Sequence, residues 1–286
     1  MDLCNINVIK VLLAKYGFRF SKSMGQNFLV ESWVPERLVL EAGVNNTHGV
    51  IEIGPGIGCL TQKLAETAGK VVAIELDSKL IPVLNETLAD RENVEVINGD
   101  ALKINIPALI EEKLPGLTPI VCANLPYNIT SPILTSLISC GRFESITVMI
   151  QKEVAKRICA KPGTADYGSF TLFVNYYTEP KILFDVSPGC FIPQPKVTSS
   201  VISMVTRKTP LVSVNDEKLL FRVIRAAFSM RRKILVNSLM SSFGNKFDKG
   251  DIADILLECG FKPLVRGEDL SLDDFARLSD AIGCRL

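Results

Sequence analysis

Residues 50–58 read Val50-Ile51-Glu52-Ile53-Gly54-Pro55-Gly56-Ile57-Gly58, and they are the best guide to the architecture of this chain. The first four residues form a short, largely apolar run that is typical of a buried strand. The glycines let the backbone turn sharply and approach a ligand closely. An amphipathic run over 60–68 then predicts a helix. This order starts an α/β unit, in which a ligand binds at the carboxyl end of the strand.

The same alternation continues along the chain. Apolar runs at 70–75, 94–97, 119–123 and 146–150 predict four further strands, and helical spacing covers 79–88. Strands and helices that alternate at these lengths imply a parallel sheet with helices on both faces. The runs 181–186 and 199–205 are expected to add an antiparallel hairpin at the sheet edge.

The pattern changes after residue 207. Helical spacing is seen over 219–228, 233–243, 252–259 and 272–282, and no strand is evident. A chain of 286 residues is long enough for one large domain and a smaller one. We therefore expect an α/β domain over 1–206 and a small all-helical domain over 207–286.

Composition limits the possible functions. The net charge is +1, so a nucleic-acid site must be a local patch. The eight cysteines form no C-x-x-C pair and the single histidine, His48, lies in a polar turn, which argues against a zinc site and a disulfide framework. We expect His48 at the surface. The sequence shows no signal peptide and no apolar run long enough to span a membrane, so we expect a cytoplasmic protein.

The glycine turn favours one class of cofactor. A dinucleotide site needs G-x-G-x-x-G, whereas Gly54, Gly56 and Gly58 are spaced G-x-G-x-G. Glu52, just upstream, would repel a pyrophosphate but suits the cationic sulfonium of S-adenosylmethionine. A purely structural glycine turn is the alternative.

Acidic side chains follow the next two strands. Glu75 ends the second strand. A carboxylate at this place can accept hydrogen bonds from both hydroxyls of a ribose, as it also does in enzymes that bind NAD. Asp100 follows the third strand beside Gly99 and could accept the amino group of adenine. The alternative for Glu75 is an ordinary acidic residue before a helix, with Asp77 as the N-cap of that helix. The alternative for Asp100 is a cap of a helix or turn.

The fourth strand ends at Asn124-Leu125-Pro126-Tyr127. Asn offers hydrogen-bond acceptors and donors, Pro restricts the turn, and Tyr presents a flat ring. Together they could hold a flat, amino-bearing heterocycle, although a plain turn with a Tyr anchor would look the same. Four such sites at four successive strand ends match the Rossmann-like methyltransferases. This order favours a catalytic role for the segment over a plain turn.

The whole chain resembles a family, the small-subunit ribosomal RNA adenine dimethyltransferases of the KsgA type. The resemblance rests on segments 23–29, 52–58, 74–77, 99–101, 124–128, 151–154, 191–197 and 228–233. It implies S-adenosylmethionine as cofactor and a lid at Gly25-Gln26-Asn27-Phe28-Leu29. Where the family usually has Lys or Arg before this segment, the chain has Met24, with Lys22 nearby. The candidate cofactor-binding residues are Gln26, Asn27, Leu29, Gly54, Gly56, Glu75, Leu76, Asp100, Ala101 and Asn124.

The expected catalysis relies on orienting the adenine amino group toward the methyl group of the cofactor. Asn124 Oδ1 and the Leu125 carbonyl would accept the two hydrogens of the adenine amino group, Pro126 would set their geometry, and Tyr127 would stack on the extruded base. The resemblance adds Phe191 on the other face of the base; a buried loop anchor is the alternative. The predicted catalytic residues are Asn124, Leu125, Pro126, Tyr127 and Phe191, with no metal.

A basic cluster in the helical domain has no acid within it. It predicts phosphate contacts, with a solvated helix surface as the alternative, and consists of Arg222, Arg225, Arg231, Arg232 and Lys233. The resemblance implies two adjacent adenosines near the 3′ end of small-subunit rRNA, in an immature small subunit, as substrate of a monomer. The rivals are a large-subunit rRNA dimethyltransferase of the antibiotic-resistance type, a non-catalytic assembly factor and an NAD oxidoreductase.

Overall fold

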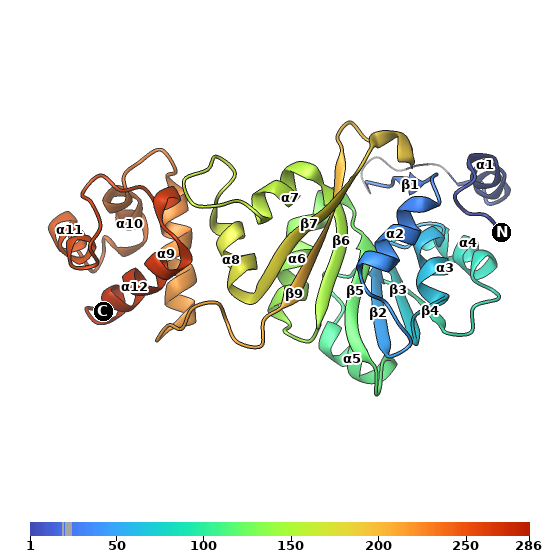
Figure 1. Cartoon of the computed structure of the whole chain (residues 1–286), viewed down its shortest axis with the longest axis horizontal. Helices are drawn as coiled ribbons and strands as arrows, with labels where there is room; N and C mark the ends of the chain where they lie inside the picture. The colour runs from blue at the N-terminus through green and yellow to red at the C-terminus, as the bar shows by residue number, and fades with distance from the viewer. Residues whose placement is uncertain (19, 21–24) are drawn as a thin grey trace. The chain divides into compact units, whose positions relative to one another are not determined.

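A computed structural model describes residues 1–18, 20 and 25–286 of the chain (Figure 1). Part of the segment that carries the family resemblance, namely Lys22, Ser23 and Met24, lies outside the described residues. The chain forms two compact units. The first comprises Met1–Ala155 and Glu179–Thr206, and the second comprises Lys156–Thr178 and Arg207–Leu286.

The first unit is built on a seven-stranded sheet with the order β4-β3-β2-β5-β6-β9-β7. The pairs from β4 to β6 are parallel, and β9 is antiparallel to β6. The strands are β2 (His48–Ile53), β3 (Lys70–Glu75), β4 (Val94–Asn98), β5 (Thr118–Asn124), β6 (Ser145–Gln151), β7 (Thr178–Val186) and β9 (Ser199–Thr206). This mostly parallel sheet confirms the predicted Rossmann-like α/β architecture.

Strand β2 marks the point where the topology reverses. The chain runs outward from β2 to β3 and β4 on one side, then returns to β5 and β6 on the other. In open α/β sheets a ligand binds outside the carboxyl ends of the strands at such a point. The fold therefore places the functional site at the ends of β2, β3 and β5.

Helices α1 to α4 share one apolar core with the sheet. Val50, Val71 and Ile120 stand at paired positions of β2, β3 and β5, and all three belong to this core. The helices are α1 (Ile6–Lys15), α2 (Trp33–Glu41), α3 (Cys59–Ala65) and α4 (Ile81–Thr87), which follows the short turn η2 (Ser78–Leu80). The unit also contains α5 (Ile106–Lys113), the turn η3 (Tyr127–Ile129) and α6 (Thr130–Ser139), and α7 (Lys152–Ile158) crosses into the second unit.

The chain also forms a small second sheet of two strands. Strand β1 (Phe28–Leu29) pairs antiparallel with β8 (Phe191–Ile192), which follows the turn η4 (Pro188–Cys190). Leu29 is paired with Phe191. This pairing attaches the segment before α2 to the Pro-rich segment between β7 and β9.

The expectation of a surface His48 is wrong. His48 is the first residue of β2, its exposed fraction is 9%, and its Nδ1 accepts a hydrogen bond from the Asn45 backbone at 3.1 Å. The strand starts before the apolar run because His48 is paired with Thr118 of β5. Pairing between distant segments is not visible in the local pattern.

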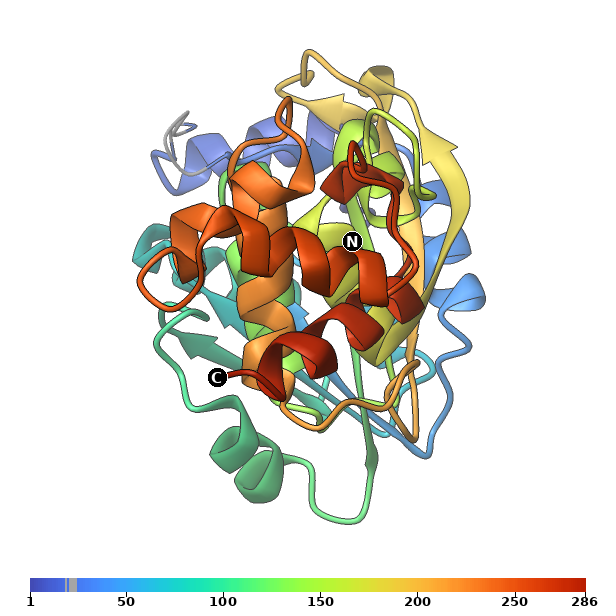
Figure 2. The ribbon, with the colours of Figure 1, turned by 90° about the vertical axis from the view of Figure 1, so that its left-hand side faces the viewer.

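The second unit is helical (Figure 2). It contains α8 (Ser169–Tyr177), α9 (Glu217–Ser229), α10 (Leu235–Phe243), α11 (Lys249–Glu258), the turn η5 (Gly267–Asp269) and α12 (Leu272–Gly283). All residues over 207–286 are described, and no strand occurs among them. Helix α9 buries Leu220, Val223 and Ala227 on one face, at the spacing of an amphipathic helix.

The second unit starts earlier than the predicted boundary at residue 207, because it also includes Lys156–Thr178. Tyr167, Leu172 and Tyr176 belong to the same apolar core as Leu220 of α9. Their aromatic and aliphatic side chains are buried there, so this earlier segment packs as part of the helical unit. None of the helices in the described parts of the chain is long and apolar enough to cross a membrane.

Candidate cofactor and adenine site

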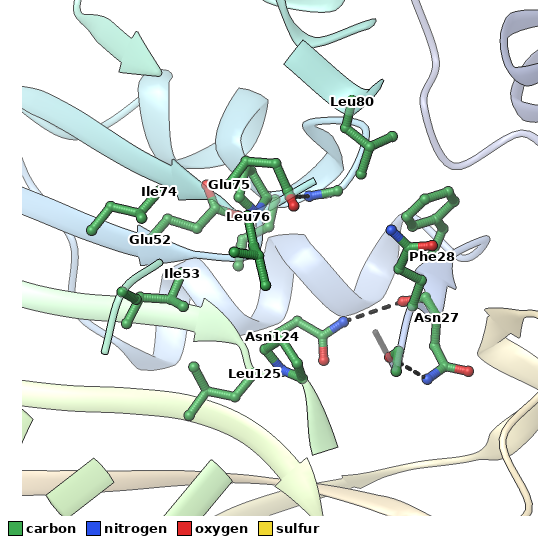
Figure 3. Close-up of a pocket in the computed structure, with 18 of the residues that line it drawn as sticks. Asn27, Phe28, Glu52, Ile53, Ile74, Glu75, Leu76, Leu80, Asn124 and Leu125 are labelled. Carbon is green, nitrogen blue, oxygen red and sulfur yellow. Dashed lines mark hydrogen bonds between the residues drawn. The ribbon is translucent and has the colours of Figure 1, made fainter. Parts of the chain in front are cut away.

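A pocket lies at the carboxyl ends of β2, β3 and β5 (Figure 3). The glycine loop, the turns after β3 and β4, the tetrapeptide after β5 and residues 25–29 line it together. The four strand-end sites of the sequence therefore meet in one place. Of the predicted cofactor-binding residues, all ten line the pocket: Gln26, Asn27, Leu29, Gly54, Gly56, Glu75, Leu76, Asp100, Ala101 and Asn124.

The glycine loop needs glycine for two reasons. Gly54 and Gly56 have φ of +72° and +62°, in the left-handed region that side chains disfavour. A Cβ atom on Gly56 would also lie 3.0 Å from the Phe28 ring, so the loop passes directly beneath β1. The loop can make this close approach only without a side chain at position 56.

Glu75 organises the backbone around the pocket. It ends β3 with an exposed fraction of 6%, and its carboxylate accepts hydrogen bonds from Gly56 N at 3.2 Å and Asp77 N at 2.8 Å. Burial raises the pKa of this carboxyl to about 6, although these backbone N–H groups stabilise the charged form. Glu75 thus connects the glycine loop to the turn after β3.

Glu52 also lines the pocket. The sequence indicated that it suits a cationic sulfonium, but it is not among the ten predicted cofactor-binding residues. Its exposed fraction is 1%, and burial raises its pKa to about 8. Its Oε2 atom has no hydrogen-bond partner in the part of the chain that the structure describes. A buried, unpaired acceptor is costly, so Glu52 is a strong candidate to meet a ligand that carries N–H donors. An acid within an otherwise apolar strand was the available sequence signal.

Asn124 presents an acceptor to the pocket. Its Nδ2 atom donates a long hydrogen bond to the Asn27 carbonyl oxygen at 3.5 Å (Figure 3). The oxygen of the amide, Oδ1, takes no part in this contact. Oδ1 is buried and finds no partner among the described residues. Leu125 N donates to Met149 O at 3.1 Å and so anchors the turn to β6. The Asn124 amide thus has one long contact, through Nδ2, and a buried acceptor without a partner among the described residues.

The ring of Tyr127 is held from β9. Its hydroxyl lies 2.6 Å from Oγ of Ser199, whose exposed fraction is 0%. Burial raises the pKa of Tyr127. Pro126 packs on the glycine loop, since a Cβ on Gly54 would lie 3.4 Å from its ring. Sequence reasoning missed Ser199, because only the tertiary fold brings it to Tyr127.

The rest of the lining supplies an apolar wall and further polar groups. The Leu76 side chain is apolar yet 53% exposed, so it offers an open surface at the pocket. Asp100 Oδ1 accepts a hydrogen bond from Leu102 N at 3.0 Å, and this bond stabilises the turn after β4. Gln26 Nε2 donates to Asp77 Oδ2 at 2.9 Å, which attaches the segment before β1 to the turn after β3.

Comparison with known proteins identifies the family. Residues 17–263 match the family described as Ribosomal RNA adenine dimethylase. The chain belongs to this family. The match confirms the predicted class of enzyme, an S-adenosylmethionine-dependent rRNA adenine dimethyltransferase.

Curated relatives support this dimethylase assignment over the full length. A protein of Streptococcus thermophilus, named "Ribosomal RNA small subunit methyltransferase A", is 47% identical, and the alignment covers 99% of this chain and 98% of the relative. A relative of the same name from a Geobacillus species is 44% identical, with 98% of both chains covered.

Solved structures are similar as well. A dimethyladenosine transferase from Plasmodium falciparum has a TM-score of 0.73 and 27% identity, covering 87% of this chain and 95% of the other. The 23S rRNA methyltransferase ErmE has a TM-score of 0.68 and 25% identity, covering 90% of this chain and 99% of the other. Of these two titles, only the second names an RNA, the 23S rRNA, whereas the names of the full-length relatives give the small ribosomal subunit.

Phe191 is the one predicted catalytic residue that does not line the dimethylase pocket. It lies in β8 with an exposed fraction of 4% and belongs to the apolar core. Its strand partner Leu29 does line the pocket. This arrangement matches the alternative interpretation, a buried ring that anchors the loop, because the hydrophobic ring packs in the core.

Two of the five predicted RNA-binding residues make internal contacts. The Arg222 guanidinium donates to the Ser242 carbonyl and lies 4.3 Å from the centre of the Phe243 ring. Arg231 donates to the Tyr167 carbonyl at 2.9 Å and to Glu268 at 3.2 Å. The acid that pairs with Arg231 is distant in sequence, so the absence of acids within the cluster did not reveal it.

The other three cations are exposed, and no described residue forms a side-chain hydrogen bond or ion pair with them. We call them the open cations: Arg225, Arg232 and Lys233. They stay the candidates for contact with phosphate. No cluster of three or more potential metal ligands occurs among the described residues.

Proposed function

We propose that this protein transfers methyl groups from S-adenosylmethionine to the amino groups of two adjacent adenosines near the 3′ end of small-subunit rRNA, giving N6,N6-dimethyladenosine. The observation that carries the proposal is the buried, unpaired Oδ1 of Asn124 at the end of β5, in a family member. Full-length relatives named for the small subunit support this choice of RNA over the large-subunit alternative.

The pocket fits S-adenosylmethionine. Glu52 Oε2 is buried and unpaired, and a cationic ligand beside it would favour the ionised carboxylate over the protonated form that burial favours. Leu76 offers an apolar surface for a flat base, and Glu75 offers acceptors for a ribose. The bound cofactor would supply an electrophilic methyl group on a positively charged sulfur. The predicted cofactor-binding residues, with Glu52 added, would hold it.

The chain's own contribution is orientation. Asn124 Oδ1 accepts one hydrogen of the adenine amino group, and the Leu125 carbonyl accepts the other. These two acceptors favour a tetrahedral nitrogen whose lone pair points at the methyl carbon. The long contact of Asn124 Nδ2 with the Asn27 carbonyl favours this orientation of the amide. After transfer, the nitrogen carries a positive charge and loses its proton to water, so no strong general base is required.

Tyr127 would stack on the base. Base–aromatic stacking contributes about 1–3 kcal/mol per base. The contact of its hydroxyl with Ser199 holds the ring in place before the RNA arrives, which lowers the entropy cost of stacking. The open cations would contact the phosphate backbone. We further propose that the substrate is the immature small subunit, that the enzyme acts as a monomer, and that both are cytoplasmic.

Methyl transfer from tritium-labelled S-adenosylmethionine tests the proposal. The wild-type protein is offered immature small subunits, free small-subunit rRNA and large subunits, and primer extension then locates the modified adenosines. We expect label in small-subunit rRNA alone. Label only in large-subunit RNA would favour the antibiotic-resistance type, and no label in any RNA would favour a non-catalytic assembly factor.

Asn124→Ala tests the role of the tetrapeptide. Loss of one oriented acceptor should lower the transfer rate by about 10²- to 10³-fold, while RNA binding in a filter assay is retained. Asn7→Ala, on the exposed face of α1, is the control and should leave both unchanged. Equal loss of RNA binding and transfer would contradict the orienting role.

A further inference from the structure

Two cysteines that the proposed reaction does not use lie in direct contact. Cys4 and Cys59 are 55 residues apart in the chain, and their Sγ atoms are 2.6 Å apart. Both thiols are free, and both belong to the apolar core of the first unit. Their exposed fractions are 9% and 8%. Spacing in the sequence gives no sign of this pair.

The pair joins the N-terminal segment to an element that borders the pocket. Cys4 lies in the N-terminal segment, which continues through α1 to the pocket residues 25–29. Leu3 is buried beside it with an exposed fraction of 2%. Cys59 begins α3 directly after the glycine loop, and it lines the pocket itself. A bond between the two sulfurs would therefore tie the start of the chain to the glycine loop.

The two thiols are not equivalent. The hydrogen bond from Cys59 lowers the pKa of Cys4, against the opposing effects of burial and of Asp2 and Glu36. The same hydrogen bond and burial raise the pKa of Cys59. The thiolate is the reactive form of cysteine, and either sulfur can donate the hydrogen bond between the two.

We propose that Cys4 and Cys59 form an oxidation site at which a peroxide produces a reversible disulfide. The thiolate of one cysteine attacks one peroxide oxygen, the O–O bond breaks, and hydroxide leaves and takes a proton to become water. The sulfur of the other cysteine, giving up its proton, then attacks the sulfenic sulfur of the first. The S–S bond forms, the S–O bond breaks and a second water leaves. The pair loses two electrons and the peroxide gains them.

Geometry favours this outcome over further oxidation of the sulfenic acid. The second thiol is already in contact with the first, so the disulfide forms without a large movement of either backbone. The bond closes a loop that contains α1, α2 and β2. Closing a long loop restricts the unfolded chain and stabilises the fold.

Peptide mapping of the full-length protein tests the proposal. Reduced protein is treated with hydrogen peroxide, digested without reductant and analysed by mass spectrometry. We expect a linked peptide containing Cys4 and Cys59 that has lost two hydrogens and that dithiothreitol separates. The melting temperature should rise by roughly 5 °C or more on oxidation. Absence of the linked peptide, with Cys4 recovered as a thiol or a sulfinic acid, would overturn the proposal.

Single variants identify the residues. Cys4→Ala and Cys59→Ala should each abolish the rise in melting temperature. Cys190→Ala is the matched control, because Cys190 lies in the same core with an exposed fraction of 7% and should leave the rise intact. A rise that persists in Cys4→Ala would contradict the assignment. If the variants do not fold, the linked peptide of the wild-type protein decides alone.

A second arm rests on the proposed function. Because Cys59 lines the pocket, S-adenosylmethionine bound there should slow disulfide formation by at least about threefold, as a ligand in contact with a thiol limits its access. An unchanged rate, with binding shown by calorimetry, would overturn this coupling. If calorimetry shows no binding, the proposed function fails, whereas the linked peptide would still establish the oxidation site.

Discussion

Glu52→Gln is expected to remove much of the pH dependence of the stability of the first unit. Burial raises the folded-state pKa of Glu52 from its ordinary value of 4.5 to about 8. The folded protein therefore keeps a proton that the unfolded chain releases. The contribution of Glu52 to stability is therefore most favourable below pH 4.5 and becomes less favourable as the pH rises toward 8, because over this range its carboxyl binds fewer protons in the unfolded state than in the folded state.

The size of the effect follows from the pKa difference. Each unit of pKa difference corresponds to about 1.36 kcal/mol. Relative to a side chain that does not ionise, Glu52 therefore lowers the free energy of unfolding by about 1 kcal/mol at pH 5 and by about 4 kcal/mol at pH 8. The free energies of unfolding of wild type and Glu52→Gln should therefore diverge by about 3 kcal/mol between these two pH values. Gln keeps the shape of the side chain but does not ionise in this range.

Urea unfolding at a series of pH values, without cofactor, measures this divergence. Trp33 is the single tryptophan and lies in α2, so its fluorescence reports on the first unit. Glu31→Gln, at an exposed position, is the control and should parallel the wild type. Parallel pH profiles of wild type and Glu52→Gln would refute the assignment of a neutral, buried Glu52.

Three further predictions concern the pocket and the open cations. Gly56→Ala should weaken S-adenosylmethionine binding in calorimetry by about tenfold or more, because the new Cβ meets the Phe28 ring at 3.0 Å. Gly43→Ala has a similar φ of +63° and no atom within 4 Å, so equal effects of the two would exclude the steric cause. Tyr127→Phe should keep stacking but loosen the ring, raising the KM for RNA about threefold with little change in kcat; a rise in KM above tenfold would mean that the hydroxyl itself binds substrate. Replacing the open cations by Ala should lower RNA affinity and reduce the salt slope by about 2. The charge-matched control replaces three other exposed cations of the second unit, Lys246, Lys249 and Lys262, and an equal change there would indicate a general charge effect.

The sequence alone determined the α/β class and most of the pocket. Apolar runs and glycine spacing are local signals, so the strands and the glycine loop could be located without the structure. The strand-end residues Glu75, Asp100 and Asn124 could be grouped as well. Parallel strands place their carboxyl ends at one edge of the sheet, and order along the chain therefore becomes proximity in space.

Only the tertiary structure decided which partner each side chain meets. Phe191 is buried against β1, Arg231 pairs with Glu268, and Cys4 touches Cys59. Each contact joins segments that are far apart in the chain, and no local pattern encodes such a distance. A side chain's burial and hydrogen bonds depend on what the fold brings to it, so residue type and spacing could propose these roles but could not choose between them.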